Sequence, residues 1–164
     1  MKKLMFAFVL VLLLCGSAVA EEVFVSHGSA VVTGIQCRKG TWTDVFNLFV
    51  TNISGSEVTV KVTLFDHDGN DRSSICKVST GSASGNGATS VSTGTGTFTL
   101  PAGATRIVAA PSSLNGMIYG HAVIEWTSAD SRLKKALMAT LQKTISYGDK
   151  SYGFMANVNG GQPF

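Results

Sequence analysis

Alternation of apolar and polar side chains defines the clearest strand in the chain, residues 57–65. The apolar positions Val58, Val60, Val62 and Leu64 alternate with the polar positions Thr59, Lys61 and Thr63. A period of two places one set on a buried face and the other in solvent. A second β-rich run, residues 45–53, precedes it, and Ser54-Gly55-Ser56 separates the two. We therefore predict that both runs are strands that pair as an antiparallel hairpin.

Further β-rich runs recur between turn residues, at positions 23–35, 97–100, 105–110, 117–126 and 152–158. Short strands separated by Gly, Asn, Ser and Asp turns are typical of β-sandwiches. No fixed period repeats and no linker divides residues 21–164. We expect one all-β domain there, an antiparallel β-sandwich of about seven to nine strands.

Residues 133–145 fit two structures. Apolar residues recur at four-residue spacing, at Leu133, Leu137, Leu141 and Ile145. This spacing suits an amphipathic helix, so a short helix at 131–143 stays open. As a strand, the same segment places Leu137, Ala139 and Leu141 on one face. We favour the strand, because a polar turn at 127–131 suits a hairpin with the run before it.

Composition changes sharply at residues 79–97, where Gly, Ser, Thr, Ala and Asn dominate and no residue is charged or aromatic. Such a segment buries too little apolar surface to order itself. We predict a flexible loop. The alternative is a segment that a partner or a neighbouring subunit orders.

Residues 1–20 have the three parts of a secretory signal peptide. Lys2 and Lys3 come first, residues 4–15 are all apolar, and Ala18-Val19-Ala20 supplies small residues for cleavage. We expect export to the periplasm, the cell surface or the medium, with lipidation of Cys15 as an alternative. The uncharged stretch at 4–20 is shorter than the roughly 20 residues that cross a bilayer, so no transmembrane segment is expected.

Charge excludes one class of partner. Removal of Lys2 and Lys3 leaves 11 of the 13 basic residues against 10 acidic ones. No cluster of cations is present that could follow a phosphate backbone. Nucleic-acid binding is therefore not expected.

Two cysteines, Cys37 and Cys76, follow the predicted signal peptide. A pair of cysteines in an exported chain is most simply one disulfide. On the loop-entropy account, closing a loop of this length stabilises the fold by about 4 kcal/mol. A reactive thiol pair or a metal site would need a shorter spacing or nearby histidines.

Candidate chemistry is sparse. Asp66, Asp68 and Asn70 alternate as at the start of a calcium loop, but a glycine and a glutamate are not at the spacing that such a loop needs. We interpret this segment as a turn and keep its three residues as weak metal candidates. The chain lacks a Gly-x-Ser-x-Gly motif and a phosphate-binding glycine loop. We expect no enzyme activity, no metal and no cofactor.

Aromatic residues offer a weak candidate binding surface. A sugar-stacking platform, a common use of β-sheet faces, could draw on Trp42, Tyr119, His121, Tyr147 and Tyr152. The alternative is structural, with Trp126 in the core and Trp42 filling the sandwich near the cysteines.

Residues 49–66 resemble the B–C hairpin of immunoglobulin-like domains in exported bacterial proteins. The chain is also similar to chaperone–usher pilus subunits, which carry an early disulfide of comparable span, although its end, Asn-Gly-Gly-Gln-Pro-Phe164, differs from their terminal strand. The resemblance implies a sandwich scaffold and transfers no functional residue. Our hypothesis is a non-catalytic exported protein that contacts other chains, including itself, as a surface, matrix or filament subunit. The alternative is a carbohydrate- or small-ligand-binding module.

Overall fold

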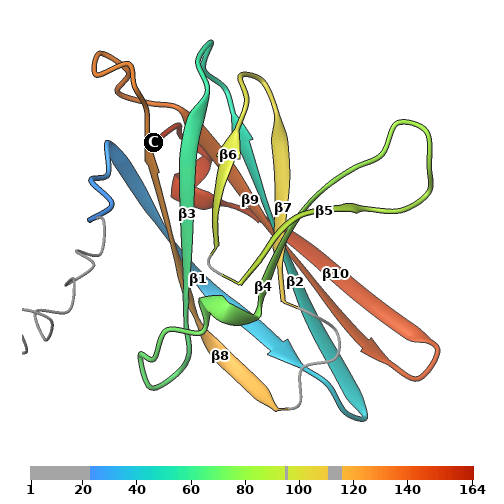
Figure 1. The fold of residues 1–164 in the computed structure, drawn as a ribbon. Coiled ribbons are helices and arrows are strands. Elements are labelled where there is room, and N and C mark those ends of the chain that lie inside the picture. Colours follow the sequence, from blue (N-terminus) through green and yellow to red (C-terminus); the bar gives the residue numbers. More distant parts are fainter. Residues whose placement is uncertain (1–22, 95, 111–115) are drawn as a thin grey trace, which may run out of the picture.

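A computed structural model describes residues 23–94, 96–110 and 116–164 of the chain. The predicted signal peptide and Cys15 lie outside these residues. The described part contains ten strands, two short 3-10 helices and no α-helix (Figure 1). The strands are β1 Gly28–Arg38, β2 Trp42–Asn52, β3 Val58–Phe65, β4 Cys76–Thr80, β5 Thr89–Gly94, β6 Thr97–Leu100, β7 Thr105–Ala109, β8 Met117–Thr127, β9 Leu137–Tyr147 and β10 Lys150–Asn157. The 3-10 helices are η1 Ser73–Ile75 and η2 Val158–Gly161.

The strands form one antiparallel sheet that is nearly closed into a barrel. Their order is β5-β4-β7-β2-β1-β8-β3-β6, and β9 and β10 branch from β2. One edge of β2 pairs with β9 along its whole length. The other edge pairs with β7 and, at Asp44, with Arg38 of β1. The all-β antiparallel fold is confirmed, whereas the immunoglobulin-like sandwich is not.

The predicted hairpin between residues 45–53 and 57–65 is wrong, although both runs are strands. β2 pairs with β7 and β9, and β3 pairs with β6 and β8. The chain crosses the barrel at Asn52, which is fully buried. Its side-chain amide donates to the carbonyl oxygens of Ser56 at 2.8 Å, Leu100 at 3.0 Å and Pro101 at 3.1 Å. These bonds hold the chain in an arch instead of a tight turn.

The strand favoured at residues 133–145 is present from Leu137, and the helix alternative at 131–143 is wrong. Its expected hairpin with residues 117–126 is also wrong. β8 lies between β1 and β3, and β9 lies between β2 and β10. Alternating side chains determine which face of a strand is buried, but they leave its neighbours undetermined.

The uncharged segment 79–97 is only partly a loop. β5 pairs with β4 from Cys76↔Gly94 to Thr80↔Thr89, and the loop proper spans residues 81–88. Backbone hydrogen bonds of the ladder order this strand although its side chains are mostly exposed.

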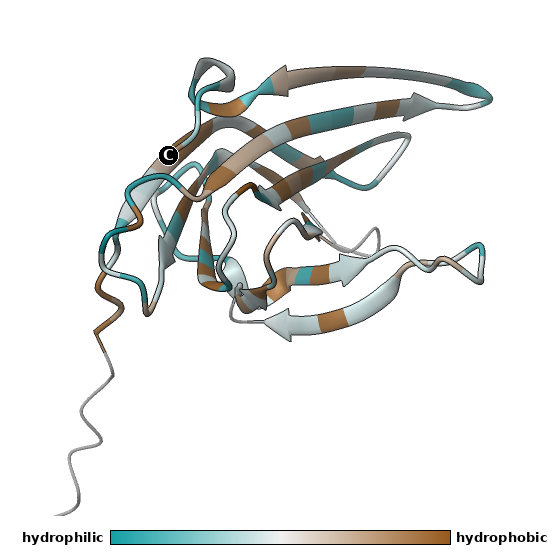
Figure 2. Ribbon diagram, turned by 90° about the horizontal axis from the view of Figure 1, so that it is seen from above, coloured by the Kyte–Doolittle hydropathy of each residue, from teal (hydrophilic) through white to brown (hydrophobic). Residues whose placement is uncertain are grey.

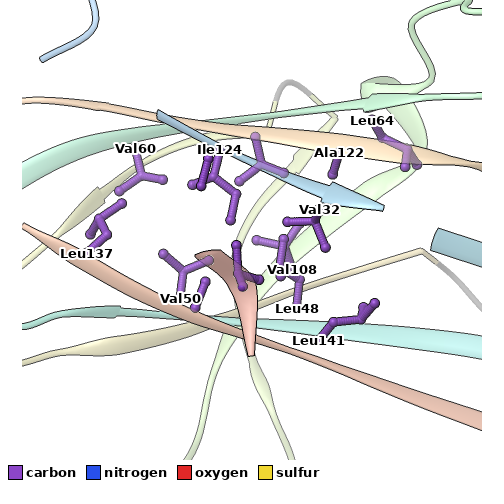
Figure 3. Packing of buried hydrophobic residues seen from close by; sticks show 14 of the residues in the cluster. Val32, Leu48, Val50, Val60, Leu64, Val108, Ala122, Ile124, Leu137 and Leu141 are labelled. Atoms are coloured by element: carbon purple, nitrogen blue, oxygen red, sulfur yellow. The ribbon is translucent and has the colours of Figure 1, made fainter. Parts of the chain in front are cut away.

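The core lies inside the barrel and is formed by the inward-facing residues of the strands (Figure 3). Leu48, Val60 and Ile124 come from three different strands and are fully buried. Trp126 is also fully buried, which confirms its structural role. In a closely packed core each buried methylene contributes to stability.

The C-terminal segment packs against the barrel. Phe164 is buried, and its backbone N–H donates to the Leu137 carbonyl at 3.0 Å. The Phe164 carbonyl accepts from the N–H groups of Ala136 and Leu137, both at 3.0 Å. Asn159, with a φ of 52°, adopts the left-handed backbone conformation within η2. The segment thereby covers the core between β1 and β9.

In the described part of the chain no helix is long and apolar enough to span a membrane.

Candidate functional site

The hairpin of β9 and β10 forms the edge of the sheet beside β2 (Figure 2). Every residue of β10 is exposed, because this strand lies outside the barrel and, among the described strands, only β9 pairs with it. Gly148, with a φ of 58°, begins the two-residue turn that joins the strands. β10 is thus an edge strand with both faces in solvent.

Four aromatic side chains line one face of this hairpin and its neighbour β2. Trp42 pairs with Tyr147, and Tyr147 pairs with Lys150, so all three are on the same face. Tyr152 and Phe154 follow at alternating positions and share that face. We call Trp42, Tyr147, Tyr152 and Phe154 the aromatic face; their exposed fractions are 43%, 46%, 62% and 51%.

Trp42 already contacts two groups of this protein. Its ring stacks on Tyr147, with the centroids 4.5 Å apart and the planes at 25°. The guanidinium carbon of Arg38 lies 5.8 Å from the Trp42 centroid, within the range of a cation–π contact. The stack fixes the orientation of both rings and leaves less of the indole surface free for a ligand.

A buried polar cluster connects the hairpin to β1 and β2. The carboxylate of Asp44, fully buried, lies 2.7 Å from Arg38 Nε and accepts from Gln36 Nε2 at 2.9 Å. Lys143 Nζ of β9 donates to Gln36 Oε1. Buried charges need such partners because burial removes their hydration. The cluster therefore ties β1 to β2 and β9.

The outer edge of β10 presents unpaired backbone groups. The N–H of Asn52 donates to Ala104 and the N–H of Ile53 donates to Ala136, so the odd-numbered residues of β2 face β9. Both registers, β2 with β9 and β9 with β10, pair odd-numbered with even-numbered residues. The even-numbered residues of β9 therefore direct their N–H and C=O groups toward β2, and its odd-numbered residues direct theirs toward β10. It follows that the even-numbered residues of β10 direct their N–H and C=O groups toward β9. The outward-facing residues are Ser151, Gly153, Met155 and Asn157. Within the described part of the chain no strand pairs with their N–H and C=O groups.

Cys37 and Cys76 are buried in the same core cluster and are free thiols in this structure. Burial, and then the charge of Asp44, raises the pKa of Cys37. Burial, the charge of Asp71 and that of Cys37 raise the pKa of Cys76 to about 12. The two thiols lie near enough for one to influence the other, and their disulfide stays a prediction.

The three weak metal candidates, Asp66, Asp68 and Asn70, form a hydrogen-bonded turn. Asp66 Oδ1 accepts from the backbone N–H groups of Asp68 and Asn70, both at 3.0 Å. Burial opposes ionisation of Asp66, but these hydrogen bonds, the Asn70 amide and the nearby His67 hold its pKa below the usual range. Asp68 is exposed and lies 3.6 Å from His67. Across the described ranges no group of three or more His, Cys, Asp or Glu side chains could hold a metal ion.

The structure separates the other predicted ligand residues. Tyr119 and His121 lie on β8, on the far side of β1 from β2, and His121 stacks on Phe65 with centroids 5.0 Å apart. Trp42, Tyr147 and Tyr152 do come together. The alternative in which Trp42 fills the interior is wrong, since the ring is 43% exposed. The sequence-based prediction of a binding surface omits Phe154 and Met155. The alternation of Tyr152 and Phe154 within one β-rich run is the signal that could have placed both rings on one face.

Comparison of the chain with protein-family models, with curated proteins and with solved structures finds no match. The aromatic face and the β10 edge are therefore the features on which a function can be proposed.

Proposed function

We propose that this protein is an exported, non-catalytic β-protein that acts through protein–protein contacts, as a surface, matrix or filament-type subunit. In this proposal the outer edge of β10 accepts an extended strand of another chain. Added strands bind through main-chain hydrogen bonds, and side chains on alternate positions give specificity.

The unprotected edge of β10 is the observation that carries this proposal. Proteins usually protect an edge strand by making it short, or by placing charges, proline or a bulge in it. β10 has eight residues and an unbroken register with β9, and it contains no proline. Its one charged residue, Lys150, is at its first position.

The surroundings of the histidines support a non-catalytic role. The ring of His27 lies edge-on to Trp126, with centroids 5.7 Å apart, and His121 stacks on Phe65. His67 lies at an exposed turn beside Asp68. In the described residues none of them forms the hydrogen bond to a serine or cysteine that would activate a nucleophile.

We further interpret the scaffold as immunoglobulin-like and the chain as exported. The crossovers from β2 to β3 and from β6 to β7 pass between the two halves of the barrel, as connections between facing sheets do. Export follows from the sequence of residues 1–20, and the destination is the periplasm, the cell surface or the medium.

A carbohydrate- or small-ligand-binding module is the second candidate, because the aromatic face exposes four rings side by side. Sugars stack on flat, accessible ring faces. The contacts of Trp42 with Tyr147 and Arg38 reduce that accessible surface. We therefore place strand addition first.

A displayed library of extended peptides and a glycan array would test the two candidates on the chain without residues 1–20. We expect peptide binders that tolerate Gly153→Ala and are lost with Gly153→Pro. Proline removes the outward N–H, whereas alanine keeps it. Saturable glycan binding that Trp42→Ala abolishes and Gly153→Pro leaves intact would contradict the proposal and support the second candidate.

A further inference from the structure

We propose that the strand added to β10 is β10 of a second copy of this chain, antiparallel to the first and related to it by a two-fold axis. This inference rests on the proposed function and names its partner. Self-pairing of an edge strand produces an isologous interface, in which each copy contributes the same residues.

One register uses every outward-facing backbone group of β10. In an antiparallel pair, two residues that face each other either exchange both hydrogen bonds or exchange none. Only residues that both point outward can therefore form the bonded pairs. If Gly153 faces Met155 of the second copy, Ser151 faces its Asn157, and all four N–H and four C=O groups are paired.

The same register places Phe154 on the two-fold axis. Phe154 then faces Phe154 of the second copy in a non-bonded pair, where side chains approach most closely. Tyr152 faces Ala156 of the second copy on the same face. The two exposed aromatic faces thus become one continuous apolar surface, and aromatic cross-strand pairs favour such contacts. On the opposite face, Met155 of each copy covers the space beside Gly153 of the other copy.

Charge also permits two copies to pair. Lys150 is the only charged residue of β10, so a self-paired ladder contains no like charges in opposition. In this register Lys150 lies beyond the last bonded pair, and the two lysines are at opposite ends of the ladder. A partner whose strand carried several acidic or basic residues would find no complementary charges along residues 151–157.

Directed crosslinking would test the inference on the chain without residues 1–20. Phe154→Cys places two thiols opposite each other at the axis, about 5 Å apart at their Cβ atoms, within reach of a disulfide. Tyr152→Cys is the matched control, because its two copies would be about 13 Å apart, four residues along the strand. Both variants would be oxidised with copper–phenanthroline and resolved on a non-reducing gel.

We expect at least a tenfold higher yield of crosslinked dimer with Phe154→Cys than with Tyr152→Cys. Light scattering on the wild type should show a mass that rises from one chain to two with concentration, a rise that Gly153→Pro removes and Gly153→Ala retains. Equal crosslinking of the two cysteine variants would overturn the register. A wild type that stays monomeric at every concentration would overturn the inference that the partner is a second copy. The proposed function would then still be tested separately, by the binding of extended peptides to β10.

Discussion

Trp42 at the start of β2 stacks on Tyr147 at the end of β9, and the two residues face each other in the strand register. The contact joins the β9–β10 hairpin to β2 next to the turn of the hairpin. The aromatic face is therefore held in place by its own members.

We predict that Trp42→Ala lowers the free energy of unfolding by about 1 kcal/mol, the usual contribution of an aromatic pair. Trp42→Phe should retain most of it. Chemical denaturation measures both changes. Tyr119→Ala removes a similarly exposed ring that stacks on no other ring of the described residues; it is the control, with an expected change within about 0.5 kcal/mol. An equal loss for Trp42→Ala and Tyr119→Ala would show that the stack does not stabilise the fold.

Asn52→Ala should destabilise the protein by about 3 kcal/mol. The substitution leaves three carbonyl oxygens without their donor, and each lost hydrogen bond costs about 1 kcal/mol. The arch between β2 and β3 depends on these bonds. Ser54→Ala, at the less buried part of the same arch, is the matched control and should cost less. A neutral Asn52→Ala would contradict the role of this side chain in the crossover.

Gly120→Ala should destabilise the protein by more than about 3 kcal/mol, because a Cβ there would lie 1.9 Å from the Phe65 carbonyl oxygen. The backbones of β8 and β3 would have to separate. Gly153→Ala places a Cβ 3.4 Å from the nearest atom and should be nearly neutral. Thermal unfolding of the two variants makes the comparison, and similar melting temperatures would show that β8 and β3 are not so close.

The reduced and oxidised proteins should differ in stability by about 4 kcal/mol, the value expected for a Cys37–Cys76 crosslink. Mass spectrometry should show both cysteines blocked from alkylation in the oxidised, denatured protein. Full alkylation of both thiols under those conditions would rule the disulfide out.

The same thiols predict how the reduced protein responds to alkali. The pKa of Cys76 is about 12 in the folded chain, above the usual thiol value of about 8.5. The folded state therefore retains its proton when the unfolded state has lost it, so stability falls as the pH rises from about 8.5 toward 12, by at most about 1.4 kcal/mol per unit for each thiol. Urea unfolding of the reduced protein between about pH 8 and pH 10 measures this slope. A Cys37–Cys76 disulfide has no thiol to titrate, so an equal slope in the oxidised protein would show that other groups cause the pH dependence.

The strands and their buried faces could be predicted from the sequence, because alternation is a local property. Val58, Val60 and Val62 are buried as their period requires. The strand partners could not be predicted, since the crossover depends on Asn52 reaching Leu100 and Pro101, far away in the sequence.

The candidate site was predictable only in part. Trp42, Tyr147 and Tyr152 could be named as exposed aromatic residues. Their convergence depends on the register of β2 with β9 and of β9 with β10, which no local pattern encodes. The exposure of both faces of β10 follows from its position outside the barrel and not from its own residues.

Amide hydrogen exchange along β10, measured by NMR as a function of protein concentration, tests the central claim most directly. The N–H groups of Tyr152, Phe154 and Ala156 face β9 and should be protected at every concentration. Those of Gly153, Met155 and Asn157 should exchange freely in dilute solution and become protected as concentration rises. Free exchange of these outward-facing groups at every concentration would contradict self-pairing of the β10 edge.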